Sequence, residues 1–196
     1  MSAPTRNDLL ITMQRVGVVL KESGAPFALA GSMAVWARGG HTSDHDVDFL
    51  IRERDVDRVL KAMREAHLRT ERPPEDWLVK VYDGDLLVDL IHRPVERPVT
   101  DATLRDADVI RVHAVALPVL SATELAIHKL LTFDEHACDF ATGLPMARSL
   151  REQVDWARVR DEVSGSSYAM AFLRLLELLE VVPPAGTAGV TAEEMA

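Results

Sequence analysis

The segment DVDFLI, at residues 46–51, limits most strictly what this chain can fold into. Successive side chains of a β-strand point to opposite faces of a sheet, so Asp46 and Asp48 lie on one face. Val47 and Phe49 point to the other face, and their apolar character predicts that it is buried. The segment therefore predicts a sheet whose second face presents two neighbouring carboxylates, which can share divalent cations.

Two further features of the sequence belong with this strand. Upstream, an apolar run ends in Gly31-Ser32, just before a short helical segment. Glycine lets the backbone approach a ligand closely, the first amides of a helix are unpaired, and the Ser32 hydroxyl adds a donor, so phosphate binding is predicted here. Downstream, Asp89 lies inside the apolar run LLVDLIH, where an isolated ionised carboxylate is costly. A metal shared with Asp46 and Asp48 removes that cost.

The chemistry of these residues indicates which metal to expect. Hard carboxylate oxygens, without a cysteine or a dense histidine cluster, suit Mg²⁺ better than zinc. Two such ions, about 3.5–4 Å apart, can clamp an in-line phosphoryl or nucleotidyl displacement. One ion then activates the attacking hydroxyl, and the other stabilises the pyrophosphate that leaves. The carboxylates therefore predict a site with two Mg²⁺ ions and an NTP substrate.

The remaining periodicities predict an α+β fold, in which a mixed sheet with helices on one face is followed by a helical bundle. We expect a catalytic core at 1–116, a helical region at 117–182 and a flexible tail at 183–196, since the tail has no apolar face. The predicted helices are 7–22, 33–38, 54–67, 122–133, 146–162 and 167–181, and the predicted strands are 27–30, 46–51, 77–82, 86–92 and 109–117.

Taken together, these motifs resemble the signature of the nucleotidyltransferase superfamily with the DNA-polymerase-β-like fold. The resembling elements are Gly31-Ser32, a spacer, Asp46-x-Asp48 in an apolar strand, and Asp89 in a later strand. The resemblance implies transfer of a nucleoside monophosphate from an NTP. It also implies that Asp46, Asp48 and Asp89 are catalytic metal ligands, and that Gly31 and Ser32 contact the phosphates of the nucleotide.

The second half of the chain resembles a narrower group. LSATELAIHKLLTF, at 120–133, and LREQVDWARV, at 150–159, are similar to the helical part of small bacterial nucleotidyltransferases. This implies a catalytic, triphosphate-binding role for Lys129 and a nucleotide-binding role for Asp155. Size and layout resemble the toxins of bacterial toxin–antitoxin pairs of the MenAT and AbiE type. Those toxins transfer nucleotides, often pyrimidines, to the 3′ end of tRNA, so the resemblance implies tRNA modification and a cognate antitoxin.

The charge of the chain keeps other acceptors open. A net charge of -9 argues against a protein coated in basic surface for nucleic acid, although it does not exclude a local basic cleft. It is also compatible with a small hydroxylated cation such as an aminoglycoside, or with a protein side chain in AMPylation. A binding module that has the fold but no turnover is a third hypothesis. Lys80, between Val79 and Val81, either faces the cleft or lies on a solvated strand face.

Three features of the sequence indicate a cytoplasmic protein. No segment approaches the length of uninterrupted apolar residues that a membrane helix needs. The first ten residues lack the layout of a signal peptide. The single cysteine, Cys138, cannot form an internal disulfide, which fits a reducing compartment. We therefore expect cytoplasmic localisation and no membrane partner.

Overall fold

The computed structural model of the chain describes residues 5–41 and 46–184. The chain forms two compact units, Met1–Ser121 and Ala122–Ala196. From residue 185 onward, the predicted tail lies outside the described residues. None of the described helices is both long enough and apolar enough to cross a membrane.

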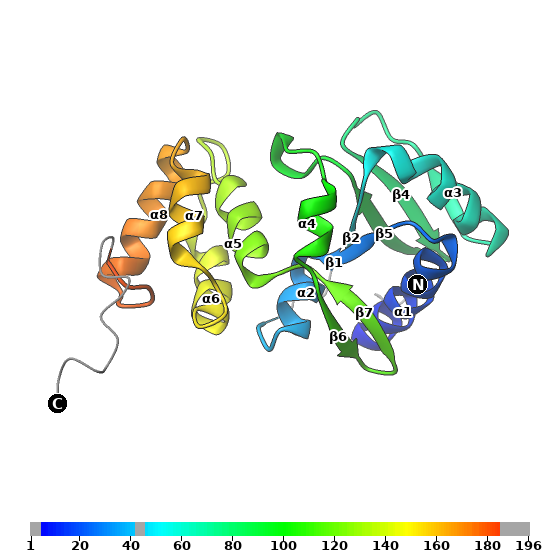
Figure 1. Ribbon diagram of the computed structural model, residues 1–196, viewed down its shortest axis with the longest axis horizontal. Helices are drawn as coiled ribbons and strands as arrows, with labels where there is room; N and C mark the ends of the chain where they lie inside the picture. The colour runs from blue at the N-terminus through cyan, green and yellow to red at the C-terminus, as the bar shows by residue number, and fades with distance from the viewer. Residues whose placement is uncertain (1–4, 42–45, 185–196) are drawn as a thin grey trace. The chain divides into compact units, whose positions relative to one another are not determined.

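The first unit contains a seven-stranded mixed sheet with the strand order β3-β4-β5-β2-β1-β7-β6 (Figure 1). The pairs β2–β5 and β1–β7 are parallel, and the other neighbours are antiparallel. This confirms the predicted α+β class. The strands are β1 Phe27–Ala30, β2 Val47–Ile51, β3 Arg69–Glu71, β4 Leu78–Asp83, β5 Leu86–Ile91, β6 Asp108–Val112 and β7 Val115–Val119, and the α-helices are α1 Arg6–Ser23, α2 Gly31–Ala37, α3 Val56–Glu65 and α4 Asp101–Arg105.

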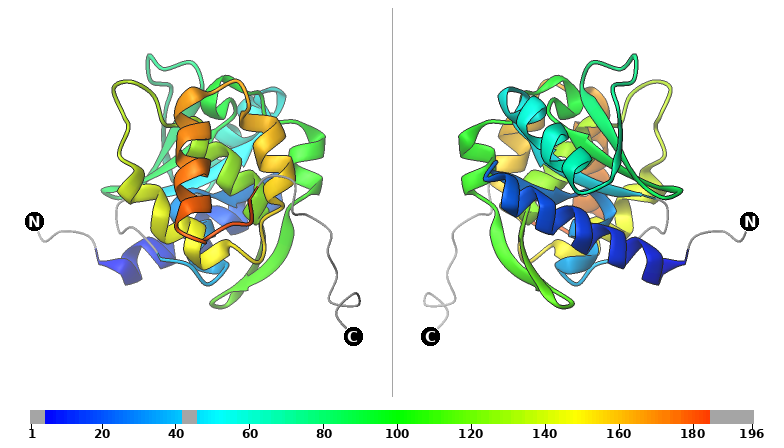
Figure 2. Two further views of the ribbon diagram at one scale, coloured as in Figure 1. Left: turned by 90° about the vertical axis from the view of Figure 1, so that its left-hand side faces the viewer. Right: turned by 90° about the vertical axis from the view of Figure 1, so that its right-hand side faces the viewer.

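One face of the sheet is packed beneath α1 and α3, which lie side by side over it (Figure 2, right). A Cβ on Gly17 of α1 would lie 2.7 Å from Cδ2 of Leu117, so this helix sits directly on β7. The alternation predicted for β2 is confirmed, because its apolar side chains on this face are buried together with those of β4 and β5. They are Val47, Phe49, Ile51, Val79, Val81, Val88 and Leu90.

The second unit is helical, with α5 Ala122–Leu131, α6 Phe140–Leu150, α7 Trp156–Val163 and α8 Ser167–Leu178. Three rings, those of Phe133, Phe140 and Phe172, contact one another with centroid separations of 5.1–5.2 Å. Gly143 of α6 packs against them, since a Cβ there would lie 2.9 Å from the tip of Phe172. An aromatic cluster therefore holds α6 and α8 together.

The structure corrects two of the predicted elements. The predicted strand 109–117 is a hairpin of β6 and β7, because the backbone turns at His113, whose φ of 53° is left-handed. The predicted helix 146–162 is two helices, α6 and α7, with a new start where Asp155 caps α7. Apolar periodicity continues through both breaks, so the pattern alone gave no sign of them.

Candidate functional site

Asp48 of β2, Asp89 of β5 and Lys80 of β4 form a polar row across the second face of the sheet, and Ala30 of β1 lies at one end of this row. The strand register places Asp48 opposite Ala30 on one side and opposite Asp89 on the other. Lys80 in turn is the partner of Asp89. Directly opposed residues on neighbouring strands point to the same face. The row therefore brings the predicted Asp48 and Asp89 together and adds Lys80 beside them.

Gly31 is built around the carboxylate of Asp48. It is the first residue of α2, directly after β1, and its φ of +57° is left-handed. A Cβ at this position would overlap the carboxylate and lie 2.8 Å from Cγ of Asp48. A side chain is thus disfavoured both by the backbone conformation and by the space that Asp48 occupies. The half-exposed Ser32 follows in the first turn of α2.

The environment of Asp48 opposes its ionisation. Desolvation by burial, followed by repulsion from Asp46 and Asp89, raises the pKa of Asp48 to about 7 from a usual value of 3.8. Carboxylates gathered in a poorly solvated place raise one another's pKa because the charged forms repel. Asp46 lies just before β2 and is close enough to act on both of the other carboxylates.

Asp89 is half-buried, and one of its oxygens is unsatisfied. Nothing within residues 5–41 and 46–184 donates a hydrogen bond to its buried Oδ1. Burial raises the pKa of Asp89 and Lys80 opposes that rise, while Asp46 and Glu75 add to it. A buried acceptor without a partner costs free energy, so such groups in folded proteins call for an explanation.

The chemistry of this donor set fits a hard divalent cation. Asp48 and Asp89 offer carboxylate oxygens across adjacent strands, and one of these oxygens has no hydrogen bond among the described residues. Asp46 raises the pKa of both carboxyl groups, and Asp89 also raises that of Asp48. A cation bound between them would reverse that cost. Over the described ranges, however, no group of three or more His, Cys, Asp or Glu side chains is arranged to hold a metal. A metal centre at Asp46, Asp48 and Asp89 therefore remains a prediction.

The other two predicted site residues, Lys129 and Asp155, belong to the second unit. Lys129 of α5 is half-buried, its Nζ lies 5.3 Å from the ring centroid of Phe133, and desolvation lowers its pKa against the attraction of Asp139. Asp155 is exposed and caps α7, because its Oδ1 accepts a hydrogen bond from Arg158 N at 3.0 Å. Its own amide donates to Thr123 Oγ1 at 3.0 Å. Asp155 thus stabilises the start of α7, and its nucleotide-binding role stays a prediction.

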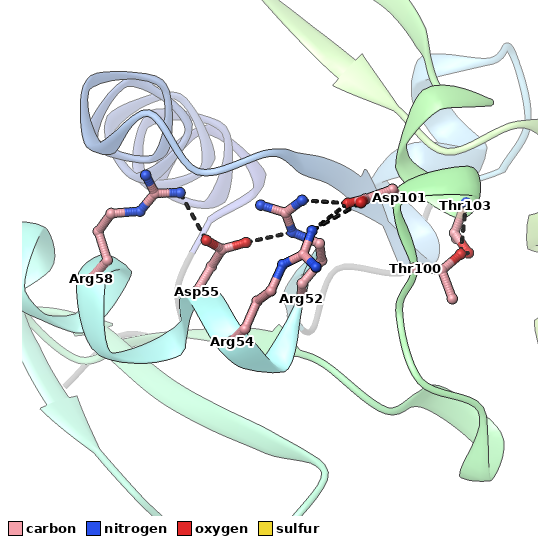
Figure 3. Close-up of polar contacts among 7 residues, drawn as sticks. All are labelled: Arg52, Arg54, Asp55, Arg58, Thr100, Asp101 and Thr103. Carbon is pink, nitrogen blue, oxygen red and sulfur yellow. Dashed lines mark hydrogen bonds and ion pairs between the residues drawn. The ribbon is translucent and has the colours of Figure 1, made fainter.

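The opposite end of β2 holds a cluster in which the charges are paired (Figure 3). Asp55 accepts from Arg52 Nε at 2.5 Å and from Arg58 at 2.8 Å. Asp101 accepts from Arg52 and, at 2.9 Å, from Arg54. This cluster ties the start of α4 to the segment after β2, and its carboxylates are satisfied within the protein.

Comparison with known proteins agrees with the fold. No protein-family model matches the sequence, and no curated protein matches it. The structure of ANT(2'')-Ia in complex with adenylyl-2''-tobramycin matches with a TM-score of 0.60 at 12% identity, over 85% of this chain and 97% of that one. The chain has the nucleotidyltransferase fold. The solution structure of the antibiotic-resistance factor ANT(2'')-Ia matches with a TM-score of 0.54 at 12% identity, over 90% and 95% of the two chains. The lincosamide antibiotic adenylyltransferase LnuA matches with a TM-score of 0.47 at 10% identity, over 74% and 96%.

The position of Lys80 was left open by the sequence, although a signal for it exists. The turn at Gly84-Asp85 makes Asp83 the partner of Leu86. Counting three residues back along β4 and three forward along β5 pairs Lys80 with Asp89. The register of this nucleotidyltransferase fold thus follows from the turn, because a two-residue connection fixes the pairing of a hairpin.

Proposed function

We propose that this protein is a nucleotidyltransferase that moves a nucleoside monophosphate from an NTP to a hydroxyl group of a small acceptor. The observation that carries the proposal is the pairing of Asp48 with Asp89 beside a glycine that makes room for the Asp48 carboxylate. Carboxylates held at such a cost are typical of functional sites rather than of folding cores. The shared fold with ANT(2'')-Ia over nearly the full length of both chains supports it.

In the proposed reaction, the acceptor oxygen bonds to the α-phosphorus of the NTP, and the bond from that phosphorus to the bridging oxygen breaks. Pyrophosphate leaves with the electron pair of that bond. The hydroxyl proton passes to a carboxylate, and Asp89 suits this task because its Oδ1 has no donor among the described residues.

Three groups of residues share the binding in this proposal. Gly31 lies beside Asp48, and Gly31 and Ser32 contact the phosphates. Asp46, Asp48 and Asp89 hold Mg²⁺, which when bound supplies positive charge for the phosphates and the attacking oxygen. Lys129 and Asp155 remain proposed nucleotide contacts from the second unit. The protein's own contribution is to hold these carboxylates in place before substrate arrives, with an apolar sheet face behind them.

The distribution of charge favours a small acceptor over a large polyanion. Arginines are the usual contacts to the phosphates of nucleic acid, but most arginines of this chain are already engaged with carboxylates. A cationic, hydroxylated acceptor matches a chain with a net charge of -9, and tobramycin appears in the matched ANT(2'')-Ia complex. The arginines in ion pairs are Arg15, Arg38, Arg52, Arg54, Arg58, Arg69, Arg72, Arg93, Arg151, Arg158, Arg160 and Arg174.

The second candidate acceptor is the 3′ end of tRNA, with the protein acting as the toxin of a toxin–antitoxin pair. The observation in its favour is the resemblance of 120–133 and 150–159 to the helical part of small bacterial nucleotidyltransferases. A pyrimidine NTP as donor and a cognate antitoxin as partner belong to this candidate. The chemical step is the same for both acceptors.

Transfer of label separates these possibilities. The purified protein is incubated with each of the four α-³²P-labelled NTPs and either tobramycin or total tRNA, with Mg²⁺ or with EDTA. We expect label on tobramycin in Mg²⁺ only, and no label with Asp48→Asn. Label confined to tRNA selects the second candidate. If neither acceptor is labelled with any NTP, the proposed activity is wrong.

A further inference from the structure

Lys80 occupies a place on the sheet that the reaction above does not yet use. It is half-buried in β4, opposite Asp89 on one side and opposite Glu71 of β3 on the other. Through all the residues that the structure describes, Lys80 forms no hydrogen bond or ion pair. Lys80 is attracted to Asp89 across the strand pair, but its ammonium group makes no hydrogen bond there and can donate to a ligand.

The neighbours of Lys80 on the same face do not share this property. Arg69 lies over the ring of Tyr82, 3.5 Å from its centroid. Glu71 accepts a hydrogen bond from the Tyr82 hydroxyl at 3.2 Å and pairs with Arg69 at 3.5 Å. These three side chains satisfy one another. The contrast leaves Lys80 as the cation of β3 and β4 that is open to a ligand.

The order of residues along the polar row shows which substrate Lys80 would meet. This step rests on the proposed function, in which the phosphates lie beside Gly31 and Ser32, next to the β1 end of the row. In an in-line displacement, the attacking oxygen arrives opposite the leaving group. The pyrophosphate therefore departs on the side of Gly31, and the acceptor enters on the side of Asp89 and Lys80.

We propose that Lys80 is an acceptor-binding residue, which donates hydrogen bonds to oxygen atoms of the sugar that carries the reacting hydroxyl. An ammonium group donates and cannot accept, so the acceptor presents oxygen rather than another ammonium at this point. A hydroxylated sugar ring satisfies this condition in an aminoglycoside and equally in the terminal ribose of an RNA. Asp89 takes the proton of the reacting hydroxyl, and Lys80 binds a neighbouring oxygen.

Steady-state kinetics with two substrates tests this assignment. KM values for the labelled NTP and for the acceptor are measured with wild type, Lys80→Met and Lys80→Arg, using tobramycin in one arm and total tRNA in the other. We expect Lys80→Met to raise the acceptor KM about tenfold or more, because it removes a charged hydrogen bond, with the NTP KM changed by less than about twofold. Lys80→Arg keeps the charge and restores most of the acceptor KM.

Lys61→Met is the matched control, since Lys61 is 77% exposed on α3 and pairs only loosely with Glu65, at 3.9 Å. Both KM values should stay at their wild-type values in this control. If Lys80→Met does not fold, Lys80→Gln is measured in its place. An unchanged acceptor KM, or an equal rise of the NTP KM, overturns the role of Lys80 while leaving the proposed function intact. Wild type that labels neither acceptor overturns both.

Discussion

The carboxylates near the two ends of β2 have opposite electrostatic surroundings. At one end, Asp48 is flanked by Asp46 and Asp89, and its pKa is raised to about 7. In the segment after the other end, Asp55 is only 7% exposed, yet it is bonded to Arg52 and Arg58. The carboxylate on β2 thus lacks a compensating cation among the described residues, whereas the carboxylate in the segment after β2 is paired with two arginines.

This difference separates the charged side chains that stabilise the fold from those that are proposed to bind a ligand. Charges that the fold needs are paired inside the protein, as in the cluster of Figure 3. In the proposed function, the charges left unpaired at a cost are those that a ligand would complete. The comparison predicts that changes at the two ends of β2 will differ in kind: one set will affect activity, and the other only stability.

The largest expected effect is on activity. Asp89→Asn removes the carboxylate that faces both Asp48 and Lys80, and we expect nucleotidyl transfer to fall about 10³-fold or more, as for other essential catalytic groups. Asp101→Asn, at the paired end, should keep transfer within about twofold of wild type. Both variants are assayed with labelled NTP at the same acceptor concentration. Comparable losses in the two variants would remove the distinction between the ends of β2.

The next effect tests the space that the unpaired carboxylate occupies. Gly31→Ala forces a Cβ into the Asp48 carboxylate and also strains a φ of +57°. We expect a loss of about 3–5 kcal/mol in the free energy of unfolding, together with loss of transfer. Gly84→Ala is the matched control: its φ is +62°, but a Cβ there meets nothing within 4 Å.

Because Gly84→Ala carries only the backbone strain, it should cost about 1 kcal/mol and leave transfer intact. Urea unfolding of the two variants, followed by circular dichroism, gives the comparison. If Gly31→Ala cost no more than Gly84→Ala, the close fit of Asp48 against residue 31 would not matter to the protein.

A third effect is a gain of stability at the unpaired end. The pKa of Asp48 is about 7 in the folded protein and 3.8 in the usual case, so the folded state holds this proton more tightly than the unfolded state. That contribution to stability is present below pH 3.8 and is lost as the pH rises through 7. At pH 8 without Mg²⁺, Asp48→Asn should be more stable than wild type by about 2 kcal/mol. The full difference between the two pKa values would correspond to at most about 4 kcal/mol.

For Asp101→Asn we expect the opposite dependence of stability on pH. Hydrogen bonds from Arg52 and Arg54 lower the pKa of Asp101, so its contribution to stability is present above the usual value of 3.8 and is lost as the pH falls below it. Asp101→Asn should therefore be less stable than wild type at pH 8. Urea titrations at pH 4, 6 and 8 measure both variants. A stability gain for Asp48→Asn that did not shrink toward pH 4 would mean that ionisation of Asp48 is not its cause.

The sequence was sufficient to place Asp48 and Asp89 on apolar strands because these signals are local, whereas it left the position of Lys80 open. Alternation along β2 places Asp48 opposite in direction to Phe49, and Phe49 is fully buried. The mixed sheet and the helical second half were predicted in the same way. Gly31 was predicted for its backbone freedom, but not for its contact with Asp48, since that contact depends on how β1 and β2 pair.

The features that sequence reasoning did not find depend on tertiary structure. His113 turns the chain between β6 and β7 without a glycine, so no turn residue marked the break. Asp155 was predicted to bind nucleotide from a resemblance, whereas its capping of α7 depends on where that helix begins. The pairing of Arg52 with Asp101 joins residues far apart in the chain. Such contacts are invisible to periodicity.

The smallest expected effect concerns Asp155, whose carboxylate, like those of Figure 3, accepts a hydrogen bond from within the protein. Asp155→Ala removes the side chain that accepts from Arg158 N and should cost about 1 kcal/mol of unfolding free energy. Asp155→Asn keeps an equally good cap without the charge, so its stability should match that of wild type. Measured beside these stabilities, the KM for NTP separates the cap from the predicted nucleotide contact. A raised NTP KM in a fully stable Asp155→Asn would give this residue a second role, and an unchanged KM would leave it as a cap alone.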